Sequence, residues 1–386
     1  MAGYDAIVVG LGAMGSAAAY HLARRGRRVL GLDARPPGHI EGSSHGESRI
    51  IRLAYYEHPD YVPLLRRAYE LWAALAAEAG EELLRPTGAL FVGRPEGELI
   101  AGSLACARRH DLPHELLDAA GIHRRYPALR PDDAEAGLFE PQAGILFADR
   151  CVAAQRRLAV AHGAELRDGT PVRRWAATAQ GVAVETDAGR FEAARLVLAA
   201  GPWLGALLAD LALPLRAERI PVFYFEPRES SDHFAPGRFP VYMWDQGAPG
   251  LFYGFPHLAL PGLKTGRHHN DAWCDPDTVD RVPNARDEGL VRAFLARHIP
   301  ALDGALTDAY ICLYTDTPDY HFLLDRHPAH PSVCFAGGFS GHGFKFAPVI
   351  GEILADLATT GRATPAADFL GGARLGLGAS GGRVAS

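Results

Sequence analysis

Apolar residues follow two spacings along the chain, and these spacings predict a protein that mixes helices with strands. Residues 4–9 are mostly apolar and β-branched, which is typical of a buried parallel strand. Residues 16–25 are rich in alanine and predict a helix, which Gly26 can end in a left-handed conformation. Residues 28–32 predict a second buried strand. This order predicts a βαβ unit at the N-terminus.

The same two spacings predict further elements along the rest of the chain. Helices are expected at residues 60–79, 96–110, 121–127, 149–162, 287–298 and 348–359. Strands are expected at 86–94, 195–199 and 333–336, in a meander over 172–191, and in a hairpin of 138–140 and 145–147. Residues 215–320 combine strand patterns with several aromatic side chains, which predicts a mixed sheet that forms a pocket wall.

A glycine-rich turn connects the first predicted strand to the first predicted helix. Gly10, Gly12 and Gly15 fit the spacing G-x-G-x-x-G, and Asp33 follows the second strand. Gly10 permits a tight turn, Gly12 lets a pyrophosphate approach the helix N-terminus, and Gly15 allows close packing of helix on strand. Asp33 can accept hydrogen bonds from a ribose 2′-hydroxyl. The turn therefore predicts dinucleotide binding, and the alternative is a glycine-rich turn in an ordinary α/β domain.

Composition and charge exclude several other classes of protein. The 386 residues suffice for two domains, and the net charge of −6 provides no basic surface for nucleic acid or an anionic membrane. No apolar run approaches the length of a transmembrane helix, and the first strand begins too early to leave room for a signal peptide. The five cysteines are scattered without metal-ligand spacing, so no disulfides and no metal are expected, and a reducing, cytoplasmic location fits best.

The basic residues are divided unevenly between their two types. Of the 39 lysines and arginines, only Lys264 and Lys345 are lysines. A compact ammonium differs from a planar guanidinium in shape, hydration and pKa behaviour, so both lysines are candidate functional residues. The alternative is a pair of surface residues at which arginine would serve equally well.

Three loops carry small or charged residues that suit a cofactor or an anionic ligand. Residues 42–52 contain a histidine and two arginines, Arg49 and Arg52, which would share one face if the segment were helical. Residues 200–203 follow a predicted strand and contain a glycine that lets backbone approach a cofactor. Residues 337–346 form a second glycine-rich loop ahead of a predicted helix, and this loop can approach the same cofactor from the other side.

With these residues the chain resembles the monomeric sarcosine oxidase family of FAD-dependent amine oxidases. The resemblance extends to about residue 370 and rests on six segments in the family's order. They are the glycine turn at 10–15, GSSHGESRIIR at 42–52, YGFP at 253–256, LKTG at 263–266, CLYT at 312–315 and GFSGHGFKF at 338–346. The resemblance implies an α/β fold of the D-amino-acid-oxidase type, in which a Rossmann-like FAD-binding domain is joined to a second, mixed-sheet substrate domain.

The resemblance also implies an activity and a covalent cofactor. The expected reaction is the oxidation of sarcosine by O2 to glycine, formaldehyde and hydrogen peroxide. The expected attachment of FAD is a thioether from the Cys312 sulfur to the flavin 8α-methyl group. By itself Cys312 would be a small core residue, and only its place in CLYT changes that interpretation.

The family assigns roles to the residues around the substrate. Arg52 and Lys345 would bind the substrate carboxylate, the first as a bidentate fork and the second as a point charge. His268 would hydrogen-bond the amine. The expected pocket walls are Tyr253, which is also a candidate catalytic residue, Tyr314 and Met243.

Three further catalytic roles concern the flavin itself. His45 and Arg49 would lie against the other face of the flavin ring, where they support attachment and tune the ring. Lys264 would lie near flavin N5 and activate O2, because a fixed ammonium stabilises the negative charge that O2 acquires.

Contacts with FAD are expected from the glycine-rich turns and from the segments that match the family. They are Gly10, Gly12, Ala13, Met14, Gly15, Asp33, Ser43, Ser44, Arg49, Ile50, Arg52, Val172, Gly201, Trp203, Cys312, Gly338, Gly341, Gly343 and Lys345.

The resemblance implies discontinuous domains. The FAD-binding domain is expected at 1–85, 149–214 and 315–375, the substrate domain at 86–148 and 215–314, and a flexible tail at 376–386. The expected partners are a small secondary amino acid and O2, for a monomer that binds neither nucleic acid nor membrane.

Several positions depart from the family pattern and leave the substrate open. Ser44 and Leu53 stand where relatives often have histidine, and the segment from Met243 to Tyr253 is one residue longer and contains Trp244. An oxidase of a bulkier N-methyl or cyclic imino acid, such as N-methyltryptophan, pipecolate or proline, is therefore an alternative. A dinucleotide-binding protein without catalytic activity is a more distant alternative, and it would have no use for Lys264, Arg52 and Lys345 together.

Overall fold

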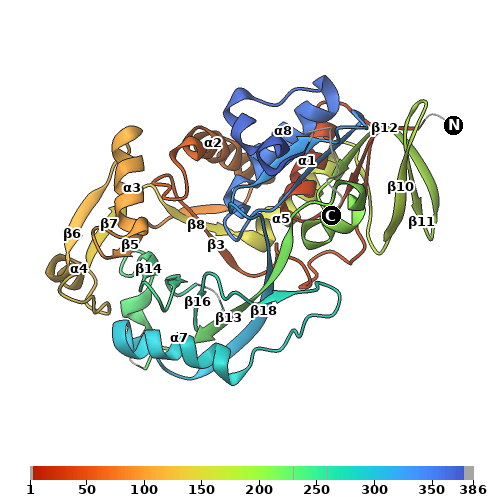
Figure 1. Ribbon diagram of the computed structural model, residues 1–386. Coiled ribbons are helices and arrows are strands. Elements are labelled where there is room, and N and C mark those ends of the chain that lie inside the picture. Colours follow the sequence, from red (N-terminus) through yellow and green to blue (C-terminus); the bar gives the residue numbers. More distant parts are fainter. Residues whose placement is uncertain (1–2, 229, 259, 378–386) are drawn as a thin grey trace, which may run out of the picture. The chain divides into compact units, whose positions relative to one another are not determined.

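The computed structural model describes residues 3–228, 230–258 and 260–377, and these residues form two compact units (Figure 1). As far as they are described, Met1–His45, Asp149–Ala217 and Tyr314–Ser386 make up the first unit, and Gly46–Ala148 and Glu218–Leu313 make up the second. The tail expected at 376–386 lies, from residue 378 onward, outside the described residues.

The first unit is built on a parallel sheet that begins with the expected βαβ unit. Strand β1 lies between two parallel neighbours, β2 and β12, while β9 continues the sheet beyond β2 and β20 continues it beyond β12. The bounds are β1 (Tyr4–Val9), α1 (Ala13–Arg24), β2 (Val29–Leu32), β9 (Glu165–Arg167), β12 (Gly189–Leu198), β20 (Val333–Gly337) and the antiparallel edge strand β19 (Leu323–Arg326). The predicted dinucleotide-binding topology is present.

The meander of the first unit differs from the prediction in one respect. Strands β10 (Val172–Thr178), β11 (Gly181–Thr186) and β12 pair in antiparallel order, as expected. A separate strand at 195–199 was expected, but β12 is one continuous strand. Its first half pairs with β11 and its second half with β1, and at Ala193 it pairs with both.

Two helices pack closely in the first unit. A Cβ added to Gly351 of α8 (Ala347–Thr360) would lie 2.4 Å from the Cβ of Ala17 in α1, so glycine allows the two helices to touch. The His21 ring of α1 lies 3.0 Å from the carbonyl oxygen of Pro348 in α8. The remaining helices of the unit are α5 (Ala148–Ala161) and α6 (Leu204–Leu207).

The second unit is built on a nine-stranded mixed sheet. The strand order is β17-β13-β16-β15-β14-β5-β7-β6, with β18 paired to β13. The bounds are β17 (Trp273–Cys274), β13 (Arg216–Phe225), β16 (Leu263–Arg267), β15 (Leu251–Gly254), β14 (Val241–Asp245), β5 (Ala89–Gly93), β7 (Ala136–Glu140), β6 (Glu115–Asp118) and β18 (Leu306–Asp316).

One face of this sheet forms the hydrophobic core of the second unit. Phe252 stacks on Phe294 of α7 (Ala285–His298), with ring centroids 4.3 Å apart, and Tyr242 and Trp244 pack on the same ring. Helix α7 begins at a capping box in which Asn284 and Asp287 satisfy each other's backbone N–H groups. The other helices of the unit are α2 (Val62–Ala79), α3 (Glu98–Arg109) and α4 (Ala119–Arg125).

The second unit also contains a three-stranded antiparallel sheet, in which β8 (Gly144–Phe147) pairs with both β3 (Ser48–Ile51) and β4 (Leu84–Pro86). These pairings hold both ends of 46–85 against β8, so this stretch groups with the second unit and not with the residues expected in the FAD-binding domain. As functional domains, the expected boundaries remain a prediction.

One local prediction for this region is wrong. Residues 138–140 and 145–147 do not form a hairpin, because β7 pairs with β5 and β6 while β8 belongs to the three-stranded sheet. The short turn between them therefore passes the chain from one sheet to the other. The condition under which Arg49 and Arg52 would share a helical face is not met, because residues 48–51 are strand β3.

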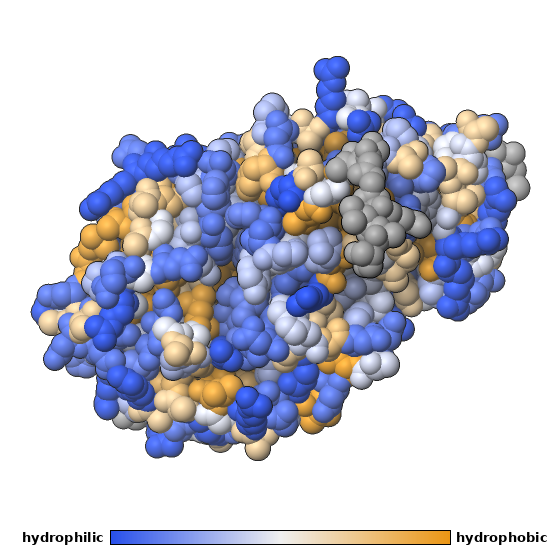
Figure 2. All heavy atoms as spheres, in the orientation of Figure 1, coloured by the Kyte–Doolittle hydropathy of each residue, from blue (hydrophilic) through white to orange (hydrophobic). Residues whose placement is uncertain are grey.

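The surface is mainly polar. Figure 2 shows hydrophilic side chains over most of the visible face, with apolar residues scattered among them. Among the described residues, no helix has the length and apolar character that crossing a membrane would require.

Candidate active site

The turn between β1 and α1 leaves no room for side chains at its glycine positions. A Cβ added at Gly15 would lie 1.7 Å from the carbonyl oxygen of Gly10, and one at Gly10 would lie 2.5 Å from that of Ala199. Gly10 also has a φ of +87°, which suits glycine. At Gly12 an added Cβ would lie 2.9 Å from Ser44 Oγ. The result is a bare backbone at a helix N-terminus, which fits a pyrophosphate.

Two predicted cofactor residues hydrogen-bond to this turn. Ser44 Oγ accepts a bond from the N–H of Ala13 at 3.0 Å. Asp33 accepts bonds from the N–H groups of Leu11, at 2.7 Å, and Arg35, at 2.9 Å, one on each carboxylate oxygen. A carboxylate can accept further bonds, so these contacts leave a role for Asp33 toward a ribose open.

Other predicted cofactor residues lie near the ends of the parallel strands. The N–H of Thr170, two residues before Val172 at the start of β10, donates to the carbonyl oxygen of Asp33 at 2.7 Å. Gly201, with a φ of +54°, opens the short 3₁₀ helix that contains Trp203 and follows β12. Ligands of α/β sheets bind at the carboxyl ends of the strands, and the role of these residues toward FAD stays a prediction.

The second glycine-rich loop is fixed to the end of β18. A Cβ added to Gly341 would lie 2.3 Å from the ring of Tyr314, so the predicted pocket residue packs directly against the loop. The N–H of Ser340 donates to the carbonyl oxygen of Thr315 at 2.9 Å. Ser340 has a φ of +45°, a strained value for a serine, which is typical of a functional loop. Gly338 also has a positive φ, of +61°.

Lys345 is buried at the end of this loop. Its side chain belongs to the 3₁₀ helix Phe344–Phe346, which leads directly into α8, and the residue is 5% exposed. Its Nζ donates to the carbonyl oxygen of His342 at 2.6 Å. Just before it, a Cβ added at Gly343 would meet the side chain of Phe339 at 2.5 Å. The ammonium therefore lies at a helix start, where the helix dipole favours bound anions.

In the second unit, the strand pairing places several predicted residues on one sheet face, which we call the site face. Met243 of β14 pairs with Tyr253 of β15, and Tyr253 pairs with Gly266 of β16. Because side chains alternate along a strand, Lys264 shares the face of Gly266, opposite the core. Phe91 of β5 pairs with Met243 and extends the same face. A Cβ at Gly266 would lie 2.9 Å from Tyr253 Oη, so this glycine makes room for the tyrosine.

Trp244, which raised doubt about the pocket, points away from this face. It packs on α7, and its indole Nε1 donates to Glu135 at 3.0 Å. Trp244 therefore belongs to the core of the second unit and does not narrow the site face.

Three predicted site residues, Lys264, Arg49 and Cys312, lie close together beside Ser48. The carbonyl oxygen of Ser48 accepts a bond from Lys264 Nζ at 2.9 Å and one from Arg49 Nη1 at 2.8 Å. The second guanidinium nitrogen of Arg49 lies 4.0 Å from Cys312 Sγ. Lys264 and Cys312 are 3% and 5% exposed, and Arg49 is half-buried. Two cations and one thiol from three separate segments thus form a compact cluster.

Glycine at position 46 allows this cluster to close. A Cβ added there would lie 2.3 Å from Tyr310 Oη and 3.6 Å from Lys264 Nζ. Gly46 has a φ of +94°, so both its backbone and its surroundings exclude a side chain. Ile50, which follows Arg49 in the sequence, pairs with Ile145 across β3 and β8.

Arg52 is 2% exposed and carries its own acidic partner. Its Nη2 forms an ion pair with Glu57 at 2.5 Å, and its Nη1 donates to the carbonyl oxygen of Ala54 at 3.1 Å. The guanidinium lies 4.2 Å from the ring centroid of Tyr55 and 5.7 Å from that of Phe91 on the site face. Burial alone would lower the pKa of Arg52, but the charge of Glu57 raises it above its usual value.

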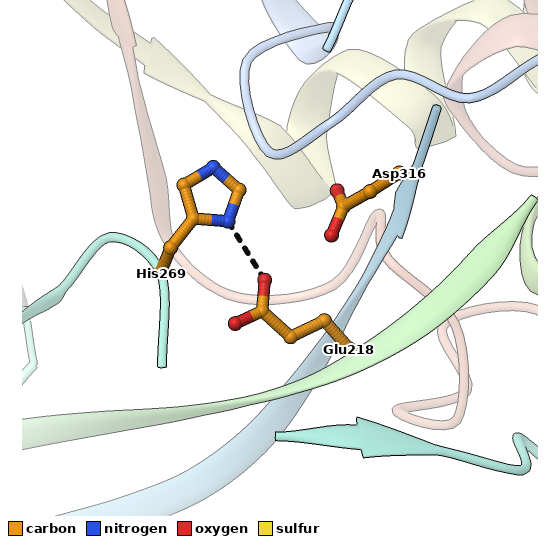
Figure 3. A group of neighbouring side chains, drawn as sticks. All are labelled: Glu218, His269 and Asp316. Atoms are coloured by element: carbon orange, nitrogen blue, oxygen red, sulfur yellow. Dashed lines mark hydrogen bonds and ion pairs between the residues drawn. The ribbon is translucent and has the colours of Figure 1, made fainter. Parts of the chain in front are cut away.

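His268 lies at the end of β16, beside a second histidine. Its ring centroid is 4.4 Å from that of His269. His269 hydrogen-bonds through Nδ1 to Glu218 at 2.7 Å (Figure 3). Glu218 also accepts bonds from the N–H groups of Asn270, at 2.5 Å, and Asp271, at 2.7 Å. Glu218 therefore holds the turn that follows His268.

Sequence reasoning missed three carboxylates that organise this site, of which Glu140 and Glu218 are buried. Glu57 pairs with Arg52, Glu218 holds the turn after His268, and Glu140 accepts bonds from the backbone that follows Arg52. Glu57 is close enough in sequence to be found as a partner of Arg52, whereas Glu140 is 86 residues from the nearer of the two N–H groups it accepts. His45, Ser43 and Met14 lie in the first unit, where His45 is 6% exposed and Met14 is 9% exposed.

Comparisons with known proteins show the family to which the chain belongs. The family described as FAD dependent oxidoreductase matches residues 5–357. The chain is 46% identical over 361 residues to a monomeric sarcosine oxidase of Streptomyces avermitilis, which covers 93% of this chain and 94% of the relative. It is 36% identical over 358 residues to an N-methyl-L-tryptophan oxidase of Salmonella arizonae, covering 92% and 94%. The solved structure of NikD, described as an unusual amino acid oxidase essential for nikkomycin biosynthesis, is similar with a TM-score of 0.85 and 29% identity, covering 95% of this chain and 97% of that one. The chain belongs to the FAD-dependent oxidoreductases and, within them, to the family of the monomeric sarcosine oxidases.

Proposed function

We propose that this protein is an oxidase that converts sarcosine, O2 and water into glycine, formaldehyde and hydrogen peroxide. The substrate class comes from the relatives, since a chain 46% identical is named monomeric sarcosine oxidase. The observation that carries the proposal is the meeting of Arg49 and Lys264 on one carbonyl oxygen, with Cys312 beside Arg49. An ordinary core does not bury a lysine such as Lys264 beside a second cation and a thiol, because a buried charge is costly without a compensating interaction.

The first unit fits an FAD molecule. Its glycine turn has no space for side chains at three positions, and this bare backbone lies at the start of α1. We assign Gly10, Gly12 and Gly15 to the pyrophosphate and Asp33 to the ribose. When bound, FAD would accept a hydride from the substrate N-methyl group and pass the electrons to O2.

Cys312 is the proposed site of covalent attachment to the flavin 8α-methyl group. The Arg49 guanidinium lies 4.0 Å from its sulfur, and Cys312 is 5% exposed, so the thiol belongs to the same compact cluster as Arg49 and Lys264. The attachment would also fix the cofactor next to the cluster around Ser48.

The substrate carboxylate is assigned to Arg52 and Lys345. Arg52 already binds one carboxylate, that of Glu57, so a substrate carboxylate can compete for the same guanidinium. Lys345 offers a buried ammonium at a helix start. Each residue is suited to an anion by its own surroundings.

The amine is assigned to His268, and the walls to Tyr253, Met243 and Tyr314. Burial raises the pKa of Tyr253 well above its usual value, so its hydroxyl stays neutral and can donate a hydrogen bond. Met243 offers an adaptable apolar surface beside it. Lys264 is assigned to the activation of O2, because a buried ammonium fixed on the carbonyl of Ser48 can stabilise the negative charge that O2 acquires.

A second candidate is an oxidase of a bulkier N-methyl or cyclic imino acid. It is favoured by the orientation of Trp244, which packs into the core and so takes no space on the site face. The 36% identity to an N-methyl-L-tryptophan oxidase agrees with this candidate. In both cases we propose that the protein acts as a monomer.

The experiment is an assay of hydrogen peroxide with the purified, FAD-loaded protein. Sarcosine should give peroxide together with formaldehyde, whereas glycine, which lacks the N-methyl group, should give no formaldehyde and serves as the control. N-methyltryptophan, pipecolate and proline are assayed in parallel. A higher kcat/KM with one of these would favour the second candidate, and the absence of peroxide with every amine would refute an oxidase.

A further inference from the structure

Glu140 is a buried carboxylate whose two oxygens both bind the backbone that follows Arg52. One oxygen accepts the N–H of Leu53 at 2.6 Å, and the other accepts the N–H of Ala54 at 2.8 Å. Glu140 is 1% exposed and lies at the end of β7, so both its position and its geometry are fixed by the sheet.

The bound backbone connects Glu140 to the Arg52 guanidinium. Ala54 gives its N–H to Glu140 and receives a bond from Arg52 Nη1 on its carbonyl oxygen, at 3.1 Å. The guanidinium is therefore two hydrogen bonds from the carboxylate, through a single residue. The other end of the guanidinium is held by Glu57.

The segment after Arg52 relies on side chains for these bonds. It leaves β3 at residue 51, and the next N–H, that of Tyr55, is accepted by the sulfur of Cys106 at 3.2 Å. Three successive N–H groups, from residues 53 to 55, are thus bound by side chains of β7 and α3. A backbone held in this way keeps its course only while those acceptors are present.

The surroundings of Glu140 compensate part of the energetic cost of burying its carboxylate. Burial raises the pKa of Glu140, while the N–H groups of Ala54 and Leu53 and the charge of Arg52 oppose that rise. The negative charge is therefore balanced by the segment that it orients and by the cation that the segment carries.

We propose that Glu140 is a positioning residue for substrate recognition, which sets the direction of the Arg52 guanidinium through the backbone of Leu53 and Ala54. The proposal rests on the carboxylate-binding role assigned to Arg52 above. Glu140 does not touch the substrate. By holding this backbone, Glu140 fixes the orientation in which the Arg52 guanidinium can bind a carboxylate.

The test is a double-mutant cycle between Glu140→Gln and Arg52→Met, with methylthioacetate as the carboxylate probe. Glutamine keeps the shape but replaces one acceptor oxygen with an NH2 group, which faces a backbone N–H and cannot accept from it. Dissociation constants are measured by titration calorimetry on the FAD-loaded protein. Glu140→Gln should weaken binding about tenfold or more in the parent background, the effect of losing one hydrogen bond to a charged group. In the Arg52→Met background it should change binding by less than about twofold.

Glu135→Gln is the matched control. Glu135 is also a buried carboxylate of the second unit, 7% exposed, and it accepts bonds from Trp244 Nε1 and Gln246 Nε2 at 3.0 and 2.9 Å, on the core side of the sheet. This variant should leave the dissociation constant within about twofold of the parent value. If Glu140→Gln does not fold, Glu140→Asp replaces it in the cycle, because it keeps the charge and shortens the reach to the two N–H groups.

The outcomes separate the two proposals. An equal loss of binding in both backgrounds, or no loss in either, overturns the positioning role of Glu140 and leaves the role of Arg52 intact. If Arg52→Met alone leaves binding unchanged, the carboxylate role of Arg52 is refuted first, and the positioning role falls with it. Kinetics provide a second readout, since a positioning role predicts a raised KM for sarcosine with a smaller change in kcat.

Discussion

Replacing Lys264 with methionine should slow the reaction of the reduced enzyme with O2 far more than the reaction with substrate. Lys264 is 3% exposed, and its hydrogen bond to the carbonyl of Ser48 fixes the ammonium, which in the proposed role stabilises the negative charge that O2 acquires. For charges about 4 Å apart at an effective dielectric constant near 20, the interaction is worth about 4 kcal/mol. This energy corresponds to roughly a thousandfold in rate.

The structure suggests that the methionine variant will fold. Methionine is slightly shorter than lysine but keeps an apolar side chain that can pack toward the rings of Phe255 and Tyr310, whose centroids lie 5.5 and 5.9 Å from Nζ. The variant loses the bond to the Ser48 carbonyl, which still accepts from Arg49, and this loss should cost about 1–3 kcal/mol of stability.

Arginine at the same position provides an informative comparison. Lys264 Nζ lies 3.6 Å from the place where a Cβ on Gly46 would be, so the space at its tip is limited. A guanidinium is larger and spreads its charge, and Lys264→Arg should therefore restore only part of the rate.

Stopped-flow measurements separate the two half-reactions. Anaerobic reduction by sarcosine should change little in Lys264→Met, whereas reoxidation by O2 should slow by two to four orders of magnitude, in line with the roughly 4 kcal/mol above. A collapse of reduction with fast reoxidation would place Lys264 on the substrate side and refute the reasoning.

Four further predictions follow from the structure. Cys312→Ala should leave FAD that acid can extract and little oxidase activity, and a Cys312 peptide of the parent protein that carries no flavin mass in mass spectrometry would contradict the attachment. Arg52→Met and Lys345→Met should each weaken methylthioacetate binding by about 10- to 150-fold, the value of a charge-assisted hydrogen bond, and unchanged calorimetric binding would exclude the residue concerned. Met243→Ala, on the site face, should shift kcat/KM toward bulkier amines, whereas Trp244→Phe, in the core, should lower the free energy of unfolding without changing the substrate preference. Burial lowers the pKa of His21 from 6.5 to about 4, so the stability that its neutral ring contributes is complete above pH 6.5 and is lost as the pH falls toward 4. His21→Gln should therefore remove up to about 3 kcal/mol of the pH dependence of the unfolding free energy in urea. An unchanged pH dependence would contradict this assignment.

Predictions made from local sequence succeeded where local physics decides the structure. The turn at 10–15 requires residues without side chains, and the spacing of its three glycines was enough to predict it. Gly80 ends α2 in the left-handed conformation for the same kind of reason. Residues 138–147 fail as a hairpin because the partners of both strands lie elsewhere in the chain, and a turn signal carries no information about them.

The site residues show the same limit more sharply. The family pattern names Arg52, but nothing in the sequence near it names Glu140, 86 and 87 residues from the two backbone groups it binds. Those contacts exist because β7 and the segment after β3 meet in the second unit. Sequence patterns therefore propose candidate chemical groups, while tertiary packing decides which other groups hydrogen-bond to their surroundings.

The two lysines show how composition can nevertheless point to a buried site. Both Lys264 and Lys345 are buried, 3% and 5% exposed, and both donate to a backbone carbonyl oxygen. Of the arginines that the structure describes, only Arg52 is buried, and it needs the carboxylate of Glu57 to be so. At the surface, arginine can replace lysine because solvent surrounds either side chain. In a closed space the larger guanidinium does not fit where a compact ammonium does. A chain with so few lysines thus marks two positions where the size of the cation matters, and these are the positions at which we propose that a charge is held for O2 and for the substrate carboxylate.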